Sequence, residues 1–244
     1  MESFSVAAEV HILPVRAADC LKLCYLLKEQ GELMTAQTVC MYLQSKEPSG
    51  HLSGSVVTHV FERLSELGYV SHTRYHGVQL TQAGEIAAAE LVRHYRLLKL
   101  FLVRILSVPL DQADGEAERL EHVLSEELEE RIDELLAYPS ADPHGDPIPD
   151  RMGRVRTVPA IPLTEVEQGR QVIIARLSVH DPDLVRYVAA LGLVPGVVVR
   201  VATRTVYGDV LTLQIGESSV TVGNVVASQL LVHAVEEGRE ATSR

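Results

Sequence analysis

The sequence lacks the features that mark secreted and membrane proteins. Its three cysteines are too few for the disulfide framework of a small secreted domain. No apolar run approaches about 18 residues without a charge, so no membrane-spanning helix and no membrane partner are expected. The first residues carry acidic side chains where a signal peptide carries basic ones. These absences predict a cytoplasmic protein.

The cysteines themselves allow two interpretations. Cys20 and Cys24 lie one helical turn apart in an apolar segment, which favours buried thiols in a hydrophobic core. Ligation of a soft metal is the alternative.

The chain also lacks any excess of basic residues, and its net charge is −11. Residues 1–107 hold ten basic and ten acidic residues, and residues 152–244 hold nine of each. The segment 108–151 holds three basic and fourteen acidic residues and therefore carries the whole excess. Either a solvated acidic helix or a cation site explains this segment.

The first third of the chain has the pattern of a winged helix-turn-helix. Apolar residues at helical spacing predict helices at 17–30, 35–44 and 55–67, and Gly68 ends the third. Two β-rich runs around a turn follow in residues 69–81 and predict a hairpin.

The remaining chain divides into a helical part and a β-rich part. Thr81 can cap a long helix at 82–107, and a further helix is expected at about 114–137. Residues 138–150 are dense in Pro, Gly and Asp and cannot continue a helix. β-rich runs at 171–177, 197–206, 209–215, 218–223 and 229–235, interrupted by one short helix, predict a small barrel.

Four motifs resemble the metal-activated repressors typified by the diphtheria toxin repressor and the manganese transport regulator. They are "DCLKLCYLL", "SGSVVTHVFERLSELGYV", "YHGVQLTQAG", and "EAERLEHVLSEELEERI" followed by "DPHGDPIP". The segment "DPDLVRYVAALGLVPGVVV" resembles the SH3-like domain that these repressors share with ferrous-iron-transport accessory proteins.

The resemblance implies a mainly α protein with a small β part. Its expected parts are a winged helix-turn-helix domain at 1–81, a helical dimerisation and metal-binding domain at 82–140, a linker at 141–160, an SH3-like β-barrel at 161–236 and a tail at 237–244. The prolines of "DPHGDPIP" are expected to fix an extended connection without chemistry of its own.

The resemblance also implies a principal metal site formed by Asp19, Glu118, Glu121 and His122. Three carboxylates and one imidazole suit Mn²⁺ or Fe²⁺, and the lack of sulfur favours Mn²⁺. Spacing alone, with these last three residues at i, i+3 and i+4, favours the solvated face of an acidic helix over a metal site.

A second metal site of the family is altered in this chain. Tyr95 and Lys99 stand where the family has a histidine and a glutamate, and a protonated Lys cannot bind a cation. Either Lys99 replaces the second cation, or a rearranged site uses other residues. The candidates for that site are His94, Asp114, His180 and Asp181. One bound ion per chain is expected in the first case and two in the second.

The expected DNA-reading surface combines the third helix and the wing. Its candidate residues are Ser53, Ser55, Thr58 and His59 on the helix, and Arg74 and His76 in the wing. Helix capping is the alternative role of Ser53 and Ser55.

The predicted function is metal-activated repression of metal uptake by a homodimer bound to a palindromic double-stranded DNA operator. Mn²⁺ is the favoured cofactor, and an iron-activated repressor of the same family is the alternative. No small-molecule substrate is expected, because no nucleophile, phosphate-binding glycine loop or general-base motif is present. A metal-buffering or adaptor protein is the alternative of a different class.

Overall fold

The computed structural model describes residues 13–46, 53–73, 77–178, 181–205 and 209–235. The chain forms two compact units. The first comprises Met1–Leu98, Ala117–Tyr138 and Ile148–Arg156, and the second comprises Lys99–Glu116, Pro139–Pro147 and Thr157–Arg244. The winged helix and the segment with Glu121 and His122 therefore belong to one unit. Among the described helices, none is long and apolar enough to cross a membrane.

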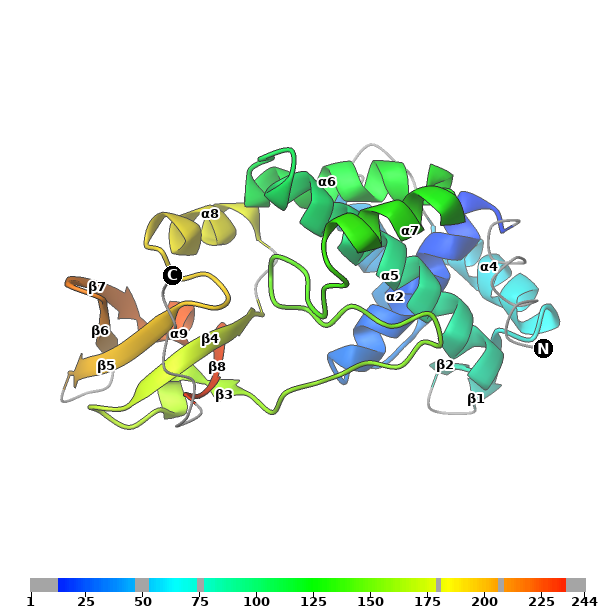
Figure 1. The fold of residues 1–244 in the computed structure, drawn as a ribbon. Coiled ribbons are helices and arrows are strands. Elements are labelled where there is room, and N and C mark those ends of the chain that lie inside the picture. The colour runs from blue at the N-terminus through cyan, green and yellow to red at the C-terminus, as the bar shows by residue number, and fades with distance from the viewer. Residues whose placement is uncertain (1–12, 47–52, 74–76, 179–180, 206–208, 236–244) are drawn as a thin grey trace. The chain divides into compact units, whose positions relative to one another are not determined.

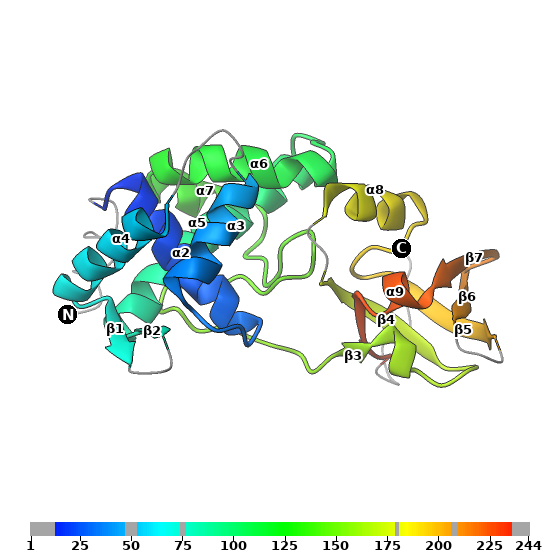
Figure 2. The same cartoon turned by 180° about the vertical axis from the view of Figure 1, so that it is seen from behind.

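The first unit contains the predicted winged helix-turn-helix (Figure 1). Its elements are α2 (Val15–Glu29), α3 (Ala36–Lys46), α4 (Gly54–Glu66), β1 (Val70–Thr73) and β2 (Gly77–Leu80). The two strands pair antiparallel. One apolar core joins the elements, with Leu21 and Cys24 of α2 buried together with Val57 and Phe61 of α4. Figure 2 shows α3 beside α2 and α4 from the other side.

Helix α5 (Gln82–Arg104) follows the wing and begins where the sequence predicts. The backbone N–H of Gly84 donates to Thr81 Oγ1 at 3.0 Å, which confirms Thr81 as the cap. The side chain of Arg96 is almost fully buried on this helix and forms two hydrogen bonds with the Glu29 carboxylate at 2.6 and 3.2 Å. This bidentate pair joins the end of α2 to α5.

The predicted single helix at 114–137 is wrong. Three helical segments occupy this region: α6 (Leu110–Leu120), the 3-10 turn η1 (Glu121–Val123) and α7 (Glu126–Leu135). Leu124 is extended at φ −71°, ψ 120°, and the Ser125 hydroxyl accepts a hydrogen bond from Leu128 N at 3.3 Å. Ser125 therefore starts a new helix, and the acidic residues that follow it favour a helix N-terminus.

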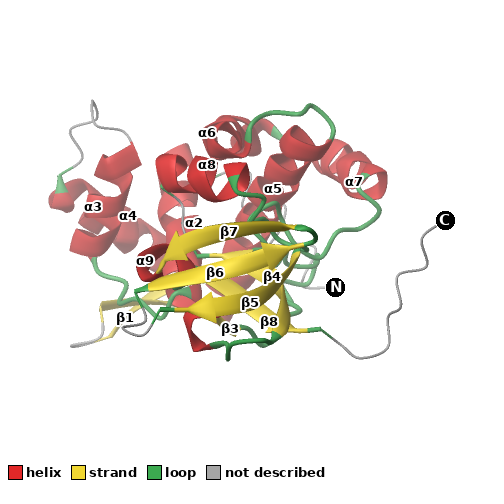
Figure 3. Cartoon of the chain, turned by 90° about the vertical axis from the view of Figure 1, so that its left-hand side faces the viewer, coloured by secondary structure: helices red, strands yellow, loops and turns green. Residues whose placement is uncertain are grey.

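A six-stranded antiparallel sheet dominates the second unit (Figure 3). The strands are β3 (Ile161–Pro162), β4 (Gln171–Leu177), β5 (Val198–Arg204), β6 (Val210–Ile215), β7 (Ser218–Gly223) and β8 (Leu230–Ala234). Five match the predicted runs, and β3 was not predicted. Their order is β3-β8-β4-β5-β6-β7, so the described strands form an open sheet instead of the expected closed barrel.

Short helical segments complete the second unit. They are η2 (Leu163–Glu165), α8 (Pro182–Ala190) and α9 (Asn224–Ala227). Val185 and Val188 of α8 are buried in the same apolar core as the strands, which places the predicted short helix on this core.

The "DPHGDPIP" segment is a folded turn, whereas the sequence predicts an extended connection. Ala141 and Pro147 form a β-bridge, and Asp142 Oδ1 accepts hydrogen bonds from the backbone N–H groups of His144 and Asp146. Gly145 has φ +83°, and a Cβ there would lie 2.0 Å from the carbonyl oxygen of Ala175. The turn therefore requires glycine where it contacts β4.

A buried polar network joins α5 to α7 within the first unit. Arg93 Nε donates to Glu129 Oε1 at 2.6 Å, and Arg93 Nη2 donates to Asp133 Oδ2 at 2.5 Å. His94 Nε2 lies 2.9 Å from Glu129 Oε2. Burial opposes ionisation of Glu129, but the hydrogen bond and charge of His94 and the charge of Arg93 outweigh it and lower the pKa of Glu129 to about 2.

This network predicts acid-dependent stability. A carboxyl whose folded pKa is lowered from 4.5 to about 2 contributes stability above its unfolded pKa and loses it as the pH falls through that interval. In urea unfolding, the free energy of unfolding of the wild type should fall by a few kcal/mol between about pH 5 and about pH 2.5. Glu129→Gln should be less stable at the higher pH and lose less stability on acidification. The exposed-site variant Glu127→Gln should behave like the wild type, and an equal acid response of all three proteins would contradict this assignment.

Candidate metal centre

Three predicted ligands converge in the first unit. One ligand atom each from Asp19, Glu121 and His122 lies within 4.8 Å of the others. His122 Nε2 is 3.0 Å from Asp19 Oδ1 and 3.5 Å from Glu121 Oε1. No other such group of three occurs among the described residues. The hydrogen bond to Asp19 raises the pKa of His122 above its ordinary value.

The local fold explains this convergence. Asp19 lies on α2 between the buried residues Ala18 and Cys20. Its own side chain is half-buried and contacts His122 of η1. Glu121 and His122 occupy η1, which the extended Leu124 separates from α7. The group therefore connects two segments about a hundred residues apart in the chain.

The buried Glu121 carboxylate is suited to a cation. Its side chain is 1% exposed, and Oε2 has no hydrogen-bond partner among the described residues. Burial raises the pKa of Glu121, although the nearby Lys22 ammonium acts in the opposite direction. An unpartnered buried carboxylate oxygen beside an imidazole and a second carboxylate fits a divalent cation with hard ligands.

Lys22 is the member of this centre that the sequence prediction missed. Its Nζ donates to Glu121 Oε1 in a buried ion pair and lies 4.8 Å from the centroid of the Tyr95 ring. Lys22 follows Asp19 by three residues, so both side chains lie on one face of α2. This three-residue spacing from Asp19 is the feature of the sequence that could have placed Lys22 in the centre.

Glu118 lies outside the three-residue group. It is half-buried on α6, one turn before η1, and the change from α-helix to 3-10 turn separates it from the regular i, i+3, i+4 face. Its role as a fourth ligand stays a prediction.

The candidates for a second site have separate local partners. Lys99 Nζ lies 2.5 Å from Asp142 and 3.2 Å from Asp114 in the second unit, and these carboxylates raise its pKa against the effect of burial. His94 pairs with Glu129 in the first unit. Asp181 accepts a hydrogen bond from Leu184 N as the cap of α8, and His180 lies outside the described residues. Each described candidate therefore has a structural role.

The predicted DNA-reading residues of α4 are exposed. Ser53 stands at the N-cap position without a side-chain capping bond, and its hydroxyl lies 2.7 Å from that of Ser55. Thr58 Oγ1 donates to the Gly54 carbonyl at 2.9 Å, and His59 Nδ1 is 3.2 Å from Glu62. Because Val57, Phe61 and Leu64 bury the opposite face, these polar residues form the accessible face of α4. Arg74 and His76 lie outside the described residues.

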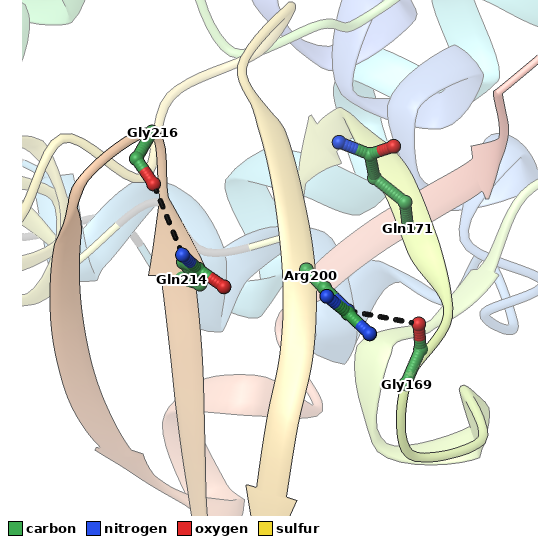
Figure 4. A pocket seen from close by; sticks show the side chains of 5 residues that line it. All are labelled: Gly169, Gln171, Arg200, Gln214 and Gly216. Carbon is green, nitrogen blue, oxygen red and sulfur yellow. Dashed lines mark hydrogen bonds between the residues drawn. The ribbon is translucent and has the colours of Figure 1, made fainter.

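A pocket of ≈370 Å³ in the second unit has no catalytic groups (Figure 4). It is lined by Gly169, Gln171, Arg200, Gln214 and Gly216. Arg200 Nε donates to the Gly169 carbonyl at 3.1 Å, and Gln214 Nε2 donates to the Gly216 carbonyl at 3.3 Å. No acid, histidine or cysteine lines the pocket.

Two family models match the chain. Residues 81–150 match the family described as "Iron dependent repressor, metal binding and dimerisation domain", and residues 161–234 match the FeoA domain. The first match contains Glu121 and His122, and the second covers the sheet of the second unit.

Relatives that align with most of this chain are also named as iron-dependent or manganese-dependent repressors. The chain is 30% identical over 197 residues to the iron-dependent repressor IdeR of Mycobacterium tuberculosis, covering 75% of this chain and 84% of that protein. It is 27% identical over 227 residues to IdeR of Mycobacterium leprae, covering 88% and 95%. A solved manganese-dependent transcriptional repressor in complex with manganese is 33% identical, with a TM-score of 0.76 over 90% of this chain and all of that one.

The winged helix, the candidate metal centre and the SH3-like second unit together define a metal-dependent transcriptional repressor, and not an enzyme. The chain belongs to the family of the iron-dependent repressors and the diphtheria toxin repressor.

The Lys22–Glu121 pair predicts a stability difference in metal-free protein. Glu121→Gln removes the negative charge beside a buried ammonium, and we expect a loss of about 1–3 kcal/mol in the free energy of unfolding, measured with a chelator present. Glu127→Gln, which alters an exposed pair with Arg131 in the first turn of α7, should change it less, by about 0.5 kcal/mol. Equal stability of the two variants would show that Lys22 and Glu121 are not paired in solution.

Proposed function

We propose that this protein is a manganese-activated repressor that binds a palindromic operator as a homodimer and controls metal uptake. The observation that carries the proposal is the convergence of Asp19 with Glu121 and His122, because it joins the DNA-reading part of the chain to the metal-binding segment. The similarity to a repressor solved in complex with manganese supports the choice of metal.

The chemistry of the ligands favours Mn²⁺ over softer ions. The group offers two carboxylates and one imidazole, and hard oxygen ligands suit Mn²⁺. Cys20 is next to Asp19 but is 1% exposed in the winged-helix core, and burial raises its pKa to about 12. A thiol held protonated in this way is a poor metal ligand. Because Fe²⁺ accepts the same oxygen and nitrogen ligands, the relatives named IdeR support an iron-activated repressor as the second candidate.

The connection to DNA binding runs through the core of the winged helix. The side chains next to Asp19 on α2 are buried in the same apolar core as those of α4, so we expect a change in the position of α2 to move the DNA-reading helix with it. A bound cation would supply the positive charge that holds Asp19 and Glu121 together. The residues of α2 and η1 would then fix α4 in the position that the operator requires.

Dimerisation supplies the second requirement. A two-fold symmetric reader needs its recognition helices about 34–36 Å apart, one turn of DNA. The matched family domain is described as a dimerisation domain, and exposed large apolar side chains in this region support a contact with a second copy. They are Leu120, Val123, Leu128 and Leu135. Metal that favours the DNA-competent dimer must in turn bind more tightly when operator is present.

The first experiment measures metal-dependent DNA binding. The operator is selected from random duplexes with the wild-type protein and Mn²⁺, and binding is followed by fluorescence anisotropy with and without Mn²⁺. We expect His122→Ala and Asp19→Ala to lose the Mn²⁺-dependent increase in affinity, at least about 100-fold, because each removes a ligand.

The matched control is Glu127→Ala, which removes an exposed acidic residue of the same segment and should retain the full Mn²⁺ response. Retention of the response by His122→Ala and Asp19→Ala, with both variants folded and dimeric, would refute the site. Titration with Mn²⁺ and with Fe²⁺ under anaerobic conditions decides between the two candidate metals.

A further inference from the structure

Lys22 places its ammonium group inside the candidate metal centre. The residue is 8% exposed, and its ammonium contacts Glu121 Oε1 on one side and the face of the Tyr95 ring on another. Taking an ammonium out of water is unfavourable unless a counter-charge and hydrogen-bond acceptors compensate. Glu121 supplies the counter-charge and Tyr95 a cation–π contact. The position of Lys22 therefore depends on the same carboxylate that the metal requires.

The two oxygens of Glu121 have different surroundings. Oε1 accepts the hydrogen bond from Lys22, whereas Oε2 is buried without a partner among the described residues. The carboxylate can thus keep Lys22 on Oε1 and offer Oε2 to a cation.

The charge of the centre matches one divalent ion. Asp19, Glu121 and the predicted fourth ligand Glu118 carry three negative charges, which Lys22 and one divalent ion together neutralise. A second divalent ion would enter a centre whose carboxylate charges are already neutralised, with the Lys22 ammonium among its neighbours. Repulsion from Lys22 and from the first ion opposes binding of the second ion.

Lys22 is better placed for this role than Lys99. The sequence suggested Lys99 as the replacement for a second cation, but Lys99 pairs with Asp114 and Asp142 in the second unit. The Asp19 group and Lys22 lie in the first unit.

We propose that Lys22 is a resident cation of the metal centre that restricts it to a single divalent ion and sets the metal concentration at which that ion binds. The inference rests on the proposed metal-binding function of Asp19, Glu121 and His122. In the metal-free protein, Lys22 neutralises Glu121 and keeps α2 beside η1. In the metal-bound protein the charge of Lys22 lowers the affinity for the ion. The protein therefore needs a higher metal concentration to respond than it would need without this charge.

The test is calorimetric titration of the full-length, metal-free protein with MnCl₂. The wild type should bind one ion per chain. Lys22→Met keeps the length and apolar stem of the side chain and removes its charge, so Mn²⁺ should bind at least about tenfold more tightly. Thermal unfolding gives a second readout: Mn²⁺ should raise the Tm of Lys22→Met more than that of the wild type, because the ion supplies the missing positive charge.

Lys28→Met is the matched control. It removes the same charge from the same helix, but Lys28 pairs with Glu85 at the surface, so its Mn²⁺ affinity should equal that of the wild type. If circular dichroism shows that Lys22→Met does not fold, Lys22→Gln, whose amide can still donate to Glu121, replaces it with the same expected result.

Three outcomes would overturn the inference. Mn²⁺ affinity of the Lys22 variant that is equal to or weaker than that of the wild type would contradict the effect on affinity. Two ions per wild-type chain would contradict the restriction to one. A wild-type protein that binds no Mn²⁺ would overturn the proposed function together with this inference, whereas the first two results leave the proposed function intact.

Discussion

The contact between α2 and η1 is the interaction on which the proposed function depends. It is a small contact, made by the hydrogen bond between His122 and Asp19 and the ion pair between Lys22 and Glu121. All four side chains are charged or become charged, and they are partly or fully buried. Because such groups are costly to bury singly, they either pair with one another or bind an ion. The contact can therefore respond to a cation while the apolar cores around it stay unchanged.

The rest of the first unit holds the two segments in place. The bidentate Arg96–Glu29 pair joins the far end of α2 to α5, and the network of Arg93, His94 and Glu129 joins α5 to α7. Both α2 and α7 are thus attached to the long helix by contacts that do not involve Asp19, Glu121 or His122. Asp19 lies toward the other end of α2, whose buried side chains share one apolar core with α4.

Much of this could be predicted from the sequence. The apolar spacing of α2 and α4, the stop at Gly68 and the Thr81 cap lie close together in the chain and have local causes. The same holds for five of the six strands of the second unit. The break at Leu124 and Ser125 was missed because the acidic residues around it are also good helix formers. The turn at "DPHGDPIP" was missed because its fold depends on contacts of Gly145 and His144 with β4.

The candidate site also contains residues that the sequence predicts and one, Lys22, whose position depends on a distant partner. Asp19, Glu121 and His122 were predicted from motifs, and the structure brings them together. Lys22 was missed because its partner Glu121 is distant in the sequence, and the three-residue spacing from Asp19 does not by itself mark a lysine as buried.

The most direct measurement is a diffraction study of the Mn²⁺-bound dimer with data collected at the manganese absorption edge. One anomalous peak per chain, in contact with Asp19, Glu121 Oε2 and His122 Nε2 and with Lys22 still on Glu121 Oε1, is the predicted result. Two peaks per chain, or a single peak beside His94 or Asp114, would contradict this account.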